Sequence, residues 1–277
     1  MGLEEVKIVG FSDNDNLLEK IGVTDFHKKY NKGEGIKVLI IDSGLEEEHP
    51  EITSNISLKY NGLERNYNVK DDSGHGTHVT SIISGVNIGI APMVEIGIIK
   101  ALSLDGGSHL SVMDALSLAI QHEYDILCLS LGTYQEPPML FKNKIHILSN
   151  KNITVCCATG NDSDSNAMFP AQLSTTIAVG GLDESLSNIA TYSNKGYDIL
   201  APSFEIFGAY KDSQYARMTG TSMANPIVVG LIALIKSFCK SNNIVLSEKK
   251  LKDLLIEEKY IHKNFLNNII NKIKESV

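Results

Sequence analysis

The chain has 277 residues, of which 43% are hydrophobic and 21% charged, so it is long enough to bury a substantial core. Its formal net charge of -8 argues against a nucleic-acid partner, because phosphate binding requires a concentrated basic surface. No stretch has the roughly 18 uninterrupted apolar residues typical of a membrane span, and the first residues lack the pattern of a secretory signal. These features predict a soluble protein of the cytoplasm with no membrane partner.

Short β-branched runs alternate with helix-length patterns along the chain. Glycines bound several of the runs, which is typical of buried parallel strands joined by helical crossovers. We therefore predict an α/β fold in which helices flank a mostly parallel central sheet. No linker or repeat divides the chain, so we expect one domain over 1–277. The predicted strands are 36–42, 94–102, 124–132, 153–161 and 175–182, and helices between them include 76–84 and 111–122.

Both ends of the chain stand apart from this pattern. Residues 1–20 form an N-terminal extension, and residues 247–277 have the apolar periodicity of a helical tail, which we interpret as packing rather than as a partner site. The four cysteines lie in apolar runs without metal-like spacing, so reduced thiols are expected. They are Cys128, Cys156, Cys157 and Cys239.

Four polar residues end predicted strands or begin predicted helices. Alone, each is consistent with an ordinary role: Asp42 and Asn161 in turns, His75 in structural contacts, and Ser222 as a helix cap. Together they supply an orienting carboxylate, a general base, an oxyanion donor and a nucleophile. A metal-dependent hydrolase is the competing hypothesis, because His75 and His78 share one side of a helix. No third ligand is evident, however, and the glutamate of the His-Glu-x-x-His motif is missing.

Three long segments occur in the order VLIIDSGLEEEHPEI, SGHGTHVTSIISG and GTSMANPIVVGLIALI. In their residues and their order they resemble the subtilisin-like serine proteases, especially the intracellular bacterial members, and the resemblance extends roughly from Gly22 to Ser237. It implies a three-layer fold and hydrolysis of peptide bonds through an acyl-enzyme. Asp42, His75 and Ser222 would form the catalytic triad, and Asn161 would stabilise the oxyanion. The alternative is a protease-shaped binding or regulatory protein without turnover.

The same resemblance implies how an extended polypeptide substrate binds. Two segments would flank the peptide and pair with its backbone, as an added strand does. A third would form one wall of the primary specificity pocket, and Met168 would lie at its base and shorten it. We therefore expect a preference for small or medium apolar residues. The implied residues are Gly106, Gly107, Ser108 and Leu110; Ser130, Leu131 and Gly132; and Ala158, Thr159, Gly160 and Met168.

The chain departs from the family pattern in its ion sites and in its regulation. The loop after His75 is shorter than in calcium-binding relatives, and Glu51 replaces the usual aspartate, so we expect the strong calcium site to be absent. Asp198 would be the remnant of a weaker cation site. No cofactor is required for the expected chemistry. Restraint of the protease would come from an inhibitor or from self-inhibition by the N-terminal segment 6–11.

Overall fold

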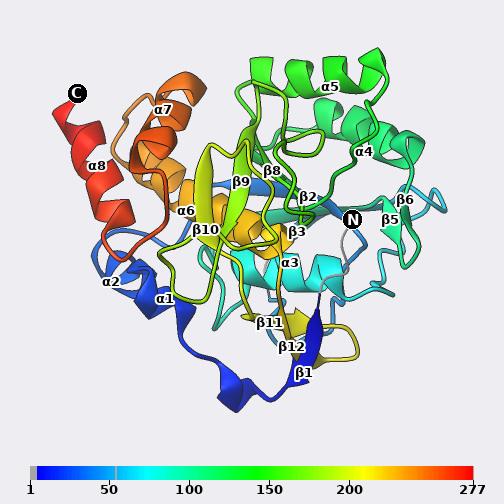
Figure 1. Ribbon diagram of the computed structural model, residues 1–277, viewed down its shortest axis with the longest axis horizontal. Coiled ribbons are helices and arrows are strands. Elements are labelled where there is room, and N and C mark those ends of the chain that lie inside the picture. Colours follow the sequence, from blue (N-terminus) through cyan, green and yellow to red (C-terminus); the bar gives the residue numbers. More distant parts are fainter. Residues whose placement is uncertain (1–4, 54, 277) are drawn as a thin grey trace.

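The computed structural model describes residues 5–53 and 55–276. A sheet of seven strands runs through the centre of the molecule (Figure 1). Every pair of neighbours in this sheet is parallel, in the order β10-β9-β8-β7-β2-β4-β3. The five predicted strands are confirmed as β2 (Lys37–Asp42), β4 (Glu95–Lys100), β7 (Ile126–Leu129), β8 (Thr154–Ala158) and β9 (Ile177–Leu182). The two edge strands, β3 (Ile56–Asn61) and β10 (Ile199–Pro202), are not among the predicted ones.

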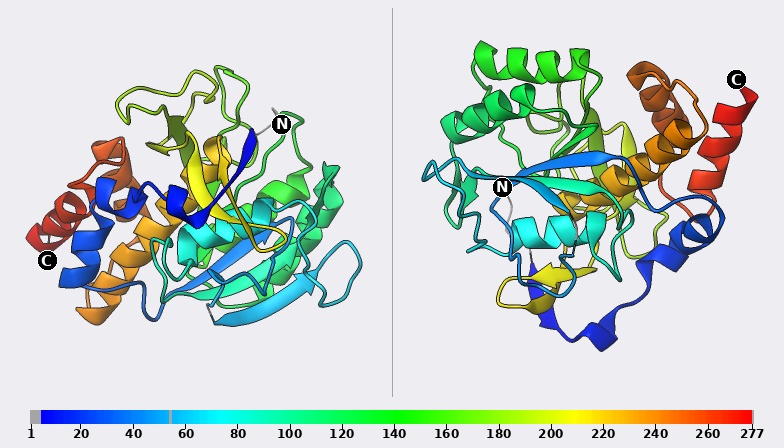
Figure 2. Two further views of the ribbon diagram at one scale, coloured as in Figure 1. Left: turned by 90° about the horizontal axis from the view of Figure 1, so that it is seen from below. Right: turned by 180° about the vertical axis from the view of Figure 1, so that it is seen from behind.

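Helices cover both faces of the sheet, as β2 illustrates. Val38 and Ile40 point into a core shared with α3 (His75–Ser84) and α6 (Thr221–Ser241). Leu39 and Ile41 point the other way, into a core shared with α4 (His109–Gln121) and α5 (Met139–Asn150). Figure 2 shows the resulting layers from two further directions. The predicted three-layer α/β architecture is therefore confirmed.

The helix α6 is the one element in the described part of the chain that is long and apolar enough to cross a membrane. The expectation that no uninterrupted apolar run reaches this length still holds, because polar residues such as Asn225 and Lys236 interrupt α6 and only its mean hydropathy is high. Its 18-residue apolar window is nevertheless 94% buried inside the protein. The hydrophobicity of α6 is thus used in packing against α3 and the central strands.

The C-terminal tail forms α7 (Glu248–Glu258) and α8 (Phe265–Glu275). Its apolar stripe joins the core that surrounds α6, and α8 also packs against α2 (Val23–Lys29). The stripe is therefore packing, as predicted. Its buried members are Leu251, Leu254, Leu255, Leu266, Ile269, Ile270 and Ile273.

The N-terminal extension supplies one strand of a second, smaller sheet (Figure 1). In that sheet β1 (Val6–Val9) pairs antiparallel with β12 (Gln214–Met218), which pairs in turn with β11 (Ile206–Tyr210). After β1 the chain continues through the short helices η1 (Phe11–Asp13) and α1 (Leu17–Lys20). The segment proposed as self-inhibitory is thus held at a sheet edge by backbone hydrogen bonds.

The order of the strands decides where a site can form. The chain adds β3 and β4 on one side of β2 and then β7, β8 and β9 on the other side. In parallel sheets, ligand sites form beyond the carboxyl ends of the strands at such a reversal. Asp42 ends β2, Ser130 follows β7, and Asn161 lies shortly after β8.

Candidate active site

Asp42 and His75 lie in direct contact. The Nδ1 atom of His75 is 2.6 Å from Oδ1 of Asp42, and the backbone N–H of Ser43 donates to the same oxygen at 2.7 Å. Both side chains are buried, with exposed fractions of 0% for Asp42 and 8% for His75. A ring that donates from Nδ1 to a carboxylate has Nε2 as its basic nitrogen, which is the form a general base requires.

The glycines on either side of His75 explain how this contact forms. A β-carbon on Gly76 would lie 2.3 Å from the carbonyl oxygen of Gly44, so only glycine lets α3 begin this close to the loop after β2. Gly74 has φ of +89° and faces the ring of Tyr210, where a β-carbon would come within 2.4 Å. The close approach of these chain segments thus requires the two glycines of SGHG.

Asp71 supports this arrangement and was not among the predicted residues. Its carboxylate is buried and accepts hydrogen bonds from the Ser43 hydroxyl (2.9 Å), from the Gly74 N–H (2.9 Å), and from the N–H and hydroxyl of Thr77 (2.8 and 2.7 Å). These bonds connect the loop after β2 to the first turn of α3. An acidic residue shortly before a helix is a capping signal, and it could have identified Asp71 in the sequence.

Ser222 and Asn161 both lie at the start of α6, where Asn161 contacts Thr221. Ser222 is the second residue of the helix and is buried, and its hydroxyl is 3.4 Å from the carbonyl oxygen of Ser130. Oδ1 of Asn161 accepts from the N–H and the hydroxyl of Thr221, at 2.8 and 3.0 Å. Because its oxygen is engaged, the amide nitrogen of Asn161 is the branch that can donate to a ligand.

The helices that carry His75 and Ser222, α3 and α6, pack against each other. His75 is the first residue of α3 and Ser222 the second of α6, and the two helices contribute to one core on the same face of the sheet. The structure therefore brings Asp42 and His75 into contact, ties Asn161 to the start of α6, and joins the two groups through the α3–α6 packing.

A cavity of about 510 Å³ lies between two of the predicted substrate-binding segments. Gly106, Gly107 and Ser108 form part of one wall, and Leu131 and Gly132 form part of another. Leu110 does not line this cavity, and its side chain is 70% exposed. Further lining residues that were not predicted include His109, Val112, Thr133, Gln135, Phe141 and Phe169.

The remaining predicted substrate-binding residues are buried, and Met168 fills the space between two of the segments. A β-carbon on Gly132 would lie 2.9 Å from the Met168 β-carbon, and one on Gly160 would lie 2.9 Å from the Met168 sulfur. The backbone N–H of Met168 donates to the Thr159 carbonyl at 2.8 Å. The side chain of Met168 is 2% exposed, so it forms the filling between these two glycines. Ser130, Ala158 and Thr159 are also buried.

Asp198, the proposed remnant of a weak cation site, and Glu51, which replaces the usual aspartate of the strong site, are both engaged with protein groups. Asp198 pairs with Lys252 at 3.0 Å, and the same ammonium donates to the carbonyls of Thr176 (2.6 Å) and Ser174 (3.1 Å). The carboxylate of Glu51 accepts from the backbone and side-chain amides of Asn87, at 2.9 and 3.0 Å. The donor set around Asp198 does not fit a resident cation, because an ammonium already supplies the positive charge there.

His78, the proposed partner of His75 in a zinc pair, contacts the small sheet. Its Nε2 lies 3.1 Å from the carbonyl oxygen of Ile206 and 3.2 Å from that of Ala216. Within residues 5–53 and 55–276, no group of three or more histidine, cysteine, aspartate or glutamate side chains is placed to hold a metal ion.

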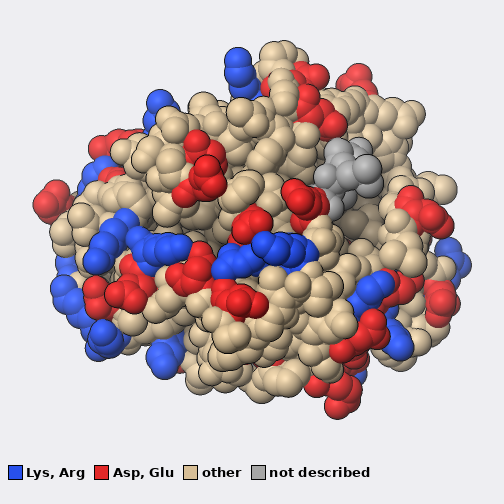
Figure 3. All heavy atoms as spheres, turned by 60° about the horizontal axis from the view of Figure 1, so that its bottom comes forward, with Lys and Arg blue, Asp and Glu red and all other residues tan. Residues whose placement is uncertain are grey.

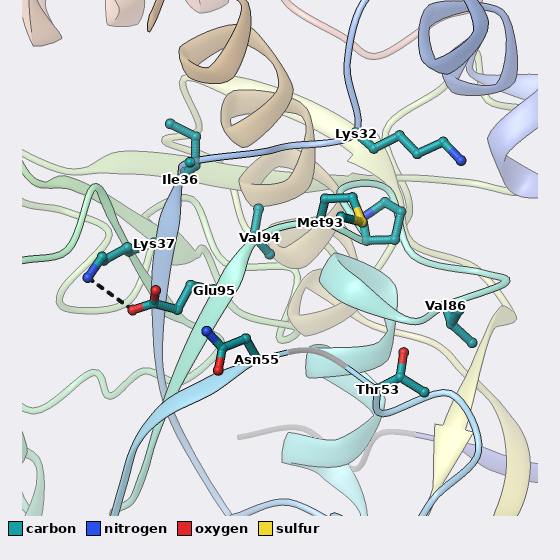
Figure 4. A pocket seen from close by; sticks show the side chains of 11 residues that line it. Lys32, Ile36, Lys37, Thr53, Asn55, Val86, Met93, Val94 and Glu95 are labelled. Atoms are coloured by element: carbon teal, nitrogen blue, oxygen red, sulfur yellow. Dashed lines mark ion pairs between the residues drawn. The ribbon is translucent and has the colours of Figure 1, made fainter.

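Two surface features lie apart from these residues. A cavity of about 440 Å³ at the amino ends of β2 and β4 is lined partly by Lys37 and Glu95, which pair at 3.0 Å (Figure 4). It contains none of the predicted site residues. On the face shown in Figure 3, lysines and arginines are interspersed with acidic residues.

Comparison with known proteins places the chain in a family. Residues 33–271 match the family model described as the subtilase family. The chain is 33% identical to subtilisin BL of Lederbergia lenta over 76% of its own length and 79% of that protein. It is 29% identical to the major intracellular serine protease of Bacillus subtilis, covering 84% of the chain and 81% of that protein.

Two further relatives extend this picture. A thermophilic serine proteinase of Bacillus sp. is 33% identical over 79% of the chain, which spans only 57% of that longer relative. A cold adapted subtilisin-like serine proteinase of known structure superposes with a TM-score of 0.74 and 28% identity, covering 82% of this chain and 83% of that one. The chain belongs to the subtilase family and is a subtilisin-like serine protease.

Proposed function

We propose that the protein is an endopeptidase that cleaves peptide bonds through Asp42, His75 and Ser222. The observation that carries the proposal is the buried contact of 2.6 Å between His75 Nδ1 and Asp42 Oδ1. In this mechanism His75 accepts the Ser222 proton at Nε2 as the serine oxygen attacks the peptide carbonyl. Asp42 holds the ring orientation and stabilises the imidazolium that forms.

The negative charge that develops on the carbonyl oxygen needs donors in place before the reaction. We assign this role to the side-chain amide of Asn161 and the backbone N–H of Ser222, which stands in the first turn of α6. The positive end of α6 adds to this stabilisation. Collapse of the tetrahedral intermediate breaks the C–N bond, and His75 passes its proton to the departing amine. Water then hydrolyses the acyl-enzyme, and Ser222 regains its proton.

We propose that the substrate is an extended polypeptide lying in the 510 Å³ cavity. Gly106 and Gly107 form the short strand β6, and a peptide between it and Leu131–Gly132 would be held by backbone hydrogen bonds. Met168 lies against Gly132 and Gly160, so it leaves less room for the side chain on the acyl side of the cut. This placement supports a preference for small or medium apolar residues at that position.

We propose that the protease acts in the cytoplasm and is restrained there by a separate inhibitor. The intracellular serine protease among its relatives supports this location, and so do four buried cysteines that form no disulfide. Self-inhibition by the segment 6–11 receives no support, because Val6–Val9 pair with β12 and none of the residues 6–11 lines the cavity.

Casein cleavage by the purified protein tests the proposed mechanism. We expect turnover that a Ser222→Ala variant lacks and that metal chelators leave unchanged. A folded wild-type protein without cleavage would favour the binding-protein hypothesis. Cleavage that chelators abolish would favour a metal-dependent hydrolase.

A further inference from the structure

The first turn of α6 contains a carbonyl group that has lost its helical hydrogen-bond donor. In a regular helix the carbonyl of Ser222 would accept from the N–H of residue 226. That residue is Pro226, which has no N–H, and Ser222 is only 3% exposed, so water has little access. The hydroxyl of Ser130 supplies the missing bond, with its Oγ 2.9 Å from the Ser222 carbonyl oxygen.

Asn225 orients the hydroxyl that makes this bond. Its Nδ2 lies 3.2 Å from Oγ of Ser130 and 3.4 Å from the carbonyl oxygen of Cys156. Because Ser130 gives its only hydroxyl hydrogen to Ser222, it must accept from Asn225, and this fixes which branch of the amide faces it. Asn225 and Ser130 are both 0% exposed, so the bonds form where polar groups are costly without partners.

The hydrogen bonds that join Asn225, Ser130 and Ser222, called the bridge from here on, connect Ser222 to the wall of the cavity. Ser130 follows β7 directly, and the next two residues, Leu131 and Gly132, line the cavity. Ser130 and Ser222 make two contacts. The Ser130 hydroxyl donates to the Ser222 carbonyl, and the Ser222 hydroxyl lies 3.4 Å from the Ser130 carbonyl oxygen. These two contacts link the position of Ser222 to that of the cavity wall.

We propose that the Ser130 hydroxyl and Asn225 are positioning residues that set the place of the Ser222 oxygen relative to the substrate. Asn225 acts through Ser130. The proposal rests on the proposed function of Ser222 as nucleophile. Its consequence is a loss in the chemical step rather than in substrate binding, because small displacements of reacting groups slow the reaction steeply.

The test compares the kinetics of Ser130→Ala, Asn225→Ala and the double variant on a peptide substrate. We expect Ser130→Ala to lower kcat by roughly 10- to 100-fold while KM changes by less than about threefold. The double variant should be no slower than Ser130→Ala, because both changes remove one chain of hydrogen bonds. Ser130→Thr, which keeps the hydroxyl, should recover most of the lost rate.

Ser237→Ala is the matched control. Ser237 is as buried as Ser130 and lies in α6, near the end opposite to Ser222. Its hydroxyl donates to the Glu34 carbonyl at 2.8 Å. This variant should lower the melting temperature about as much as Ser130→Ala but leave kcat unchanged within about twofold.

The inference is overturned if Ser130→Ala reduces kcat no more than Ser237→Ala, or if the effects of Ser130→Ala and Asn225→Ala on kcat multiply in the double variant. If Ser130→Ala does not fold, the loss in kcat of Asn225→Ala is compared with that of Ser237→Ala instead. Wild-type turnover that depends on Ser222, measured alongside, shows that such a failure concerns the bridge and not the proposed function.

Discussion

His75 and Asp42 share a buried hydrogen bond of 2.6 Å, and they reach it from different elements, the start of α3 and the end of β2. If His75 is the general base, His75→Ala should lower kcat by roughly 100- to 10,000-fold with little change in KM. The measurement is steady-state hydrolysis of a peptide substrate. His146→Ala, which alters a histidine on α5 that contacts Thr175, is the control and should retain full activity. Equal rates for the two variants would contradict the assignment.

Asn161 allows its two amide atoms to be tested separately. Asn161→Asp keeps an oxygen for the Thr221 N–H and hydroxyl but lacks the donating nitrogen, whereas Asn161→Leu loses both. We expect either change to lower kcat by about 100- to 1,000-fold, a range that comes from removing such a donor in subtilisin itself. Thermal unfolding should be affected more by Asn161→Leu. Near-wild-type turnover in Asn161→Asp would remove Asn161 from the oxyanion site.

Met168→Ala should widen the specificity of the enzyme. The thioether fills the space beside Gly132 and Gly160, so shortening it makes room for an aromatic side chain. In a panel of peptides that differ only at the acyl-side residue, kcat/KM for phenylalanine relative to alanine should rise by roughly tenfold. An unchanged ratio, or a wild type that already prefers phenylalanine, would show that Met168 does not limit the pocket.

Lys252 should stabilise the fold in place of a bound cation. Its ammonium joins α7 to Asp198 and to the carbonyls of Ser174 and Thr176. Lys252→Met leaves these acceptors without their donor, and we expect the melting temperature to fall by roughly 3 to 8 °C. Lys249→Met, an exposed neighbour on α7, should have almost no effect.

The same account predicts that a chelator leaves the melting temperature of the wild type unchanged. A clear fall on adding chelator would show that a cation is bound and contributes to stability. Equal melting temperatures for the two lysine variants would show that the Lys252 contacts contribute little.

Glu258 should make the tail sensitive to acid. Burial opposes ionisation of this carboxyl, but hydrogen bonds from Lys272 (2.7 Å), Asn268 (3.1 Å) and His262 (3.3 Å) outweigh it and hold the pKa of Glu258 below its ordinary value. A carboxyl with a lowered pKa in the folded state adds stability above its unfolded pKa of about 4.3. That stability is lost as the pH falls through the folded pKa.

Urea unfolding of Glu258→Gln at several pH values measures this contribution. The variant should be less stable than the wild type at pH 7, and the difference should shrink below about pH 4. Glu257→Gln, which alters an exposed carboxylate paired with the same lysine, is the control and should show a much smaller difference. A deficit for Glu258→Gln that does not change with pH would contradict the linkage.

The central strands and the principal polar residues could be predicted from the sequence because their signals are local. After the exposed Lys37, the run that becomes β2 is apolar because both of its faces are buried, and Asp42 interrupts it where the strand ends. The glycines beside His75 likewise mark a close approach that the structure shows. Such patterns involve only neighbouring residues, so they can be recognised in the sequence without knowledge of the fold.

Other features depend on contacts between distant segments. Nothing near Val6 indicates that it will pair with Met218, or that Lys252 will meet Asp198. The role of the Ser130 side chain depends on the missing N–H of Pro226, a residue almost a hundred positions later. The edge strand β3 is also harder to recognise, because it is only partly buried and its apolar pattern is weak.

The central claim is that Ser222 is the nucleophile, and covalent labelling tests it most directly. The purified protein is treated with a fluorophosphonate, digested with trypsin and mapped by mass spectrometry. We predict one adduct on Ser222, matched by loss of casein cleavage and absent from both Ser222→Ala and His75→Ala. A wild type that cleaves casein but carries its adduct on another residue, or takes up no adduct at all, would contradict the account.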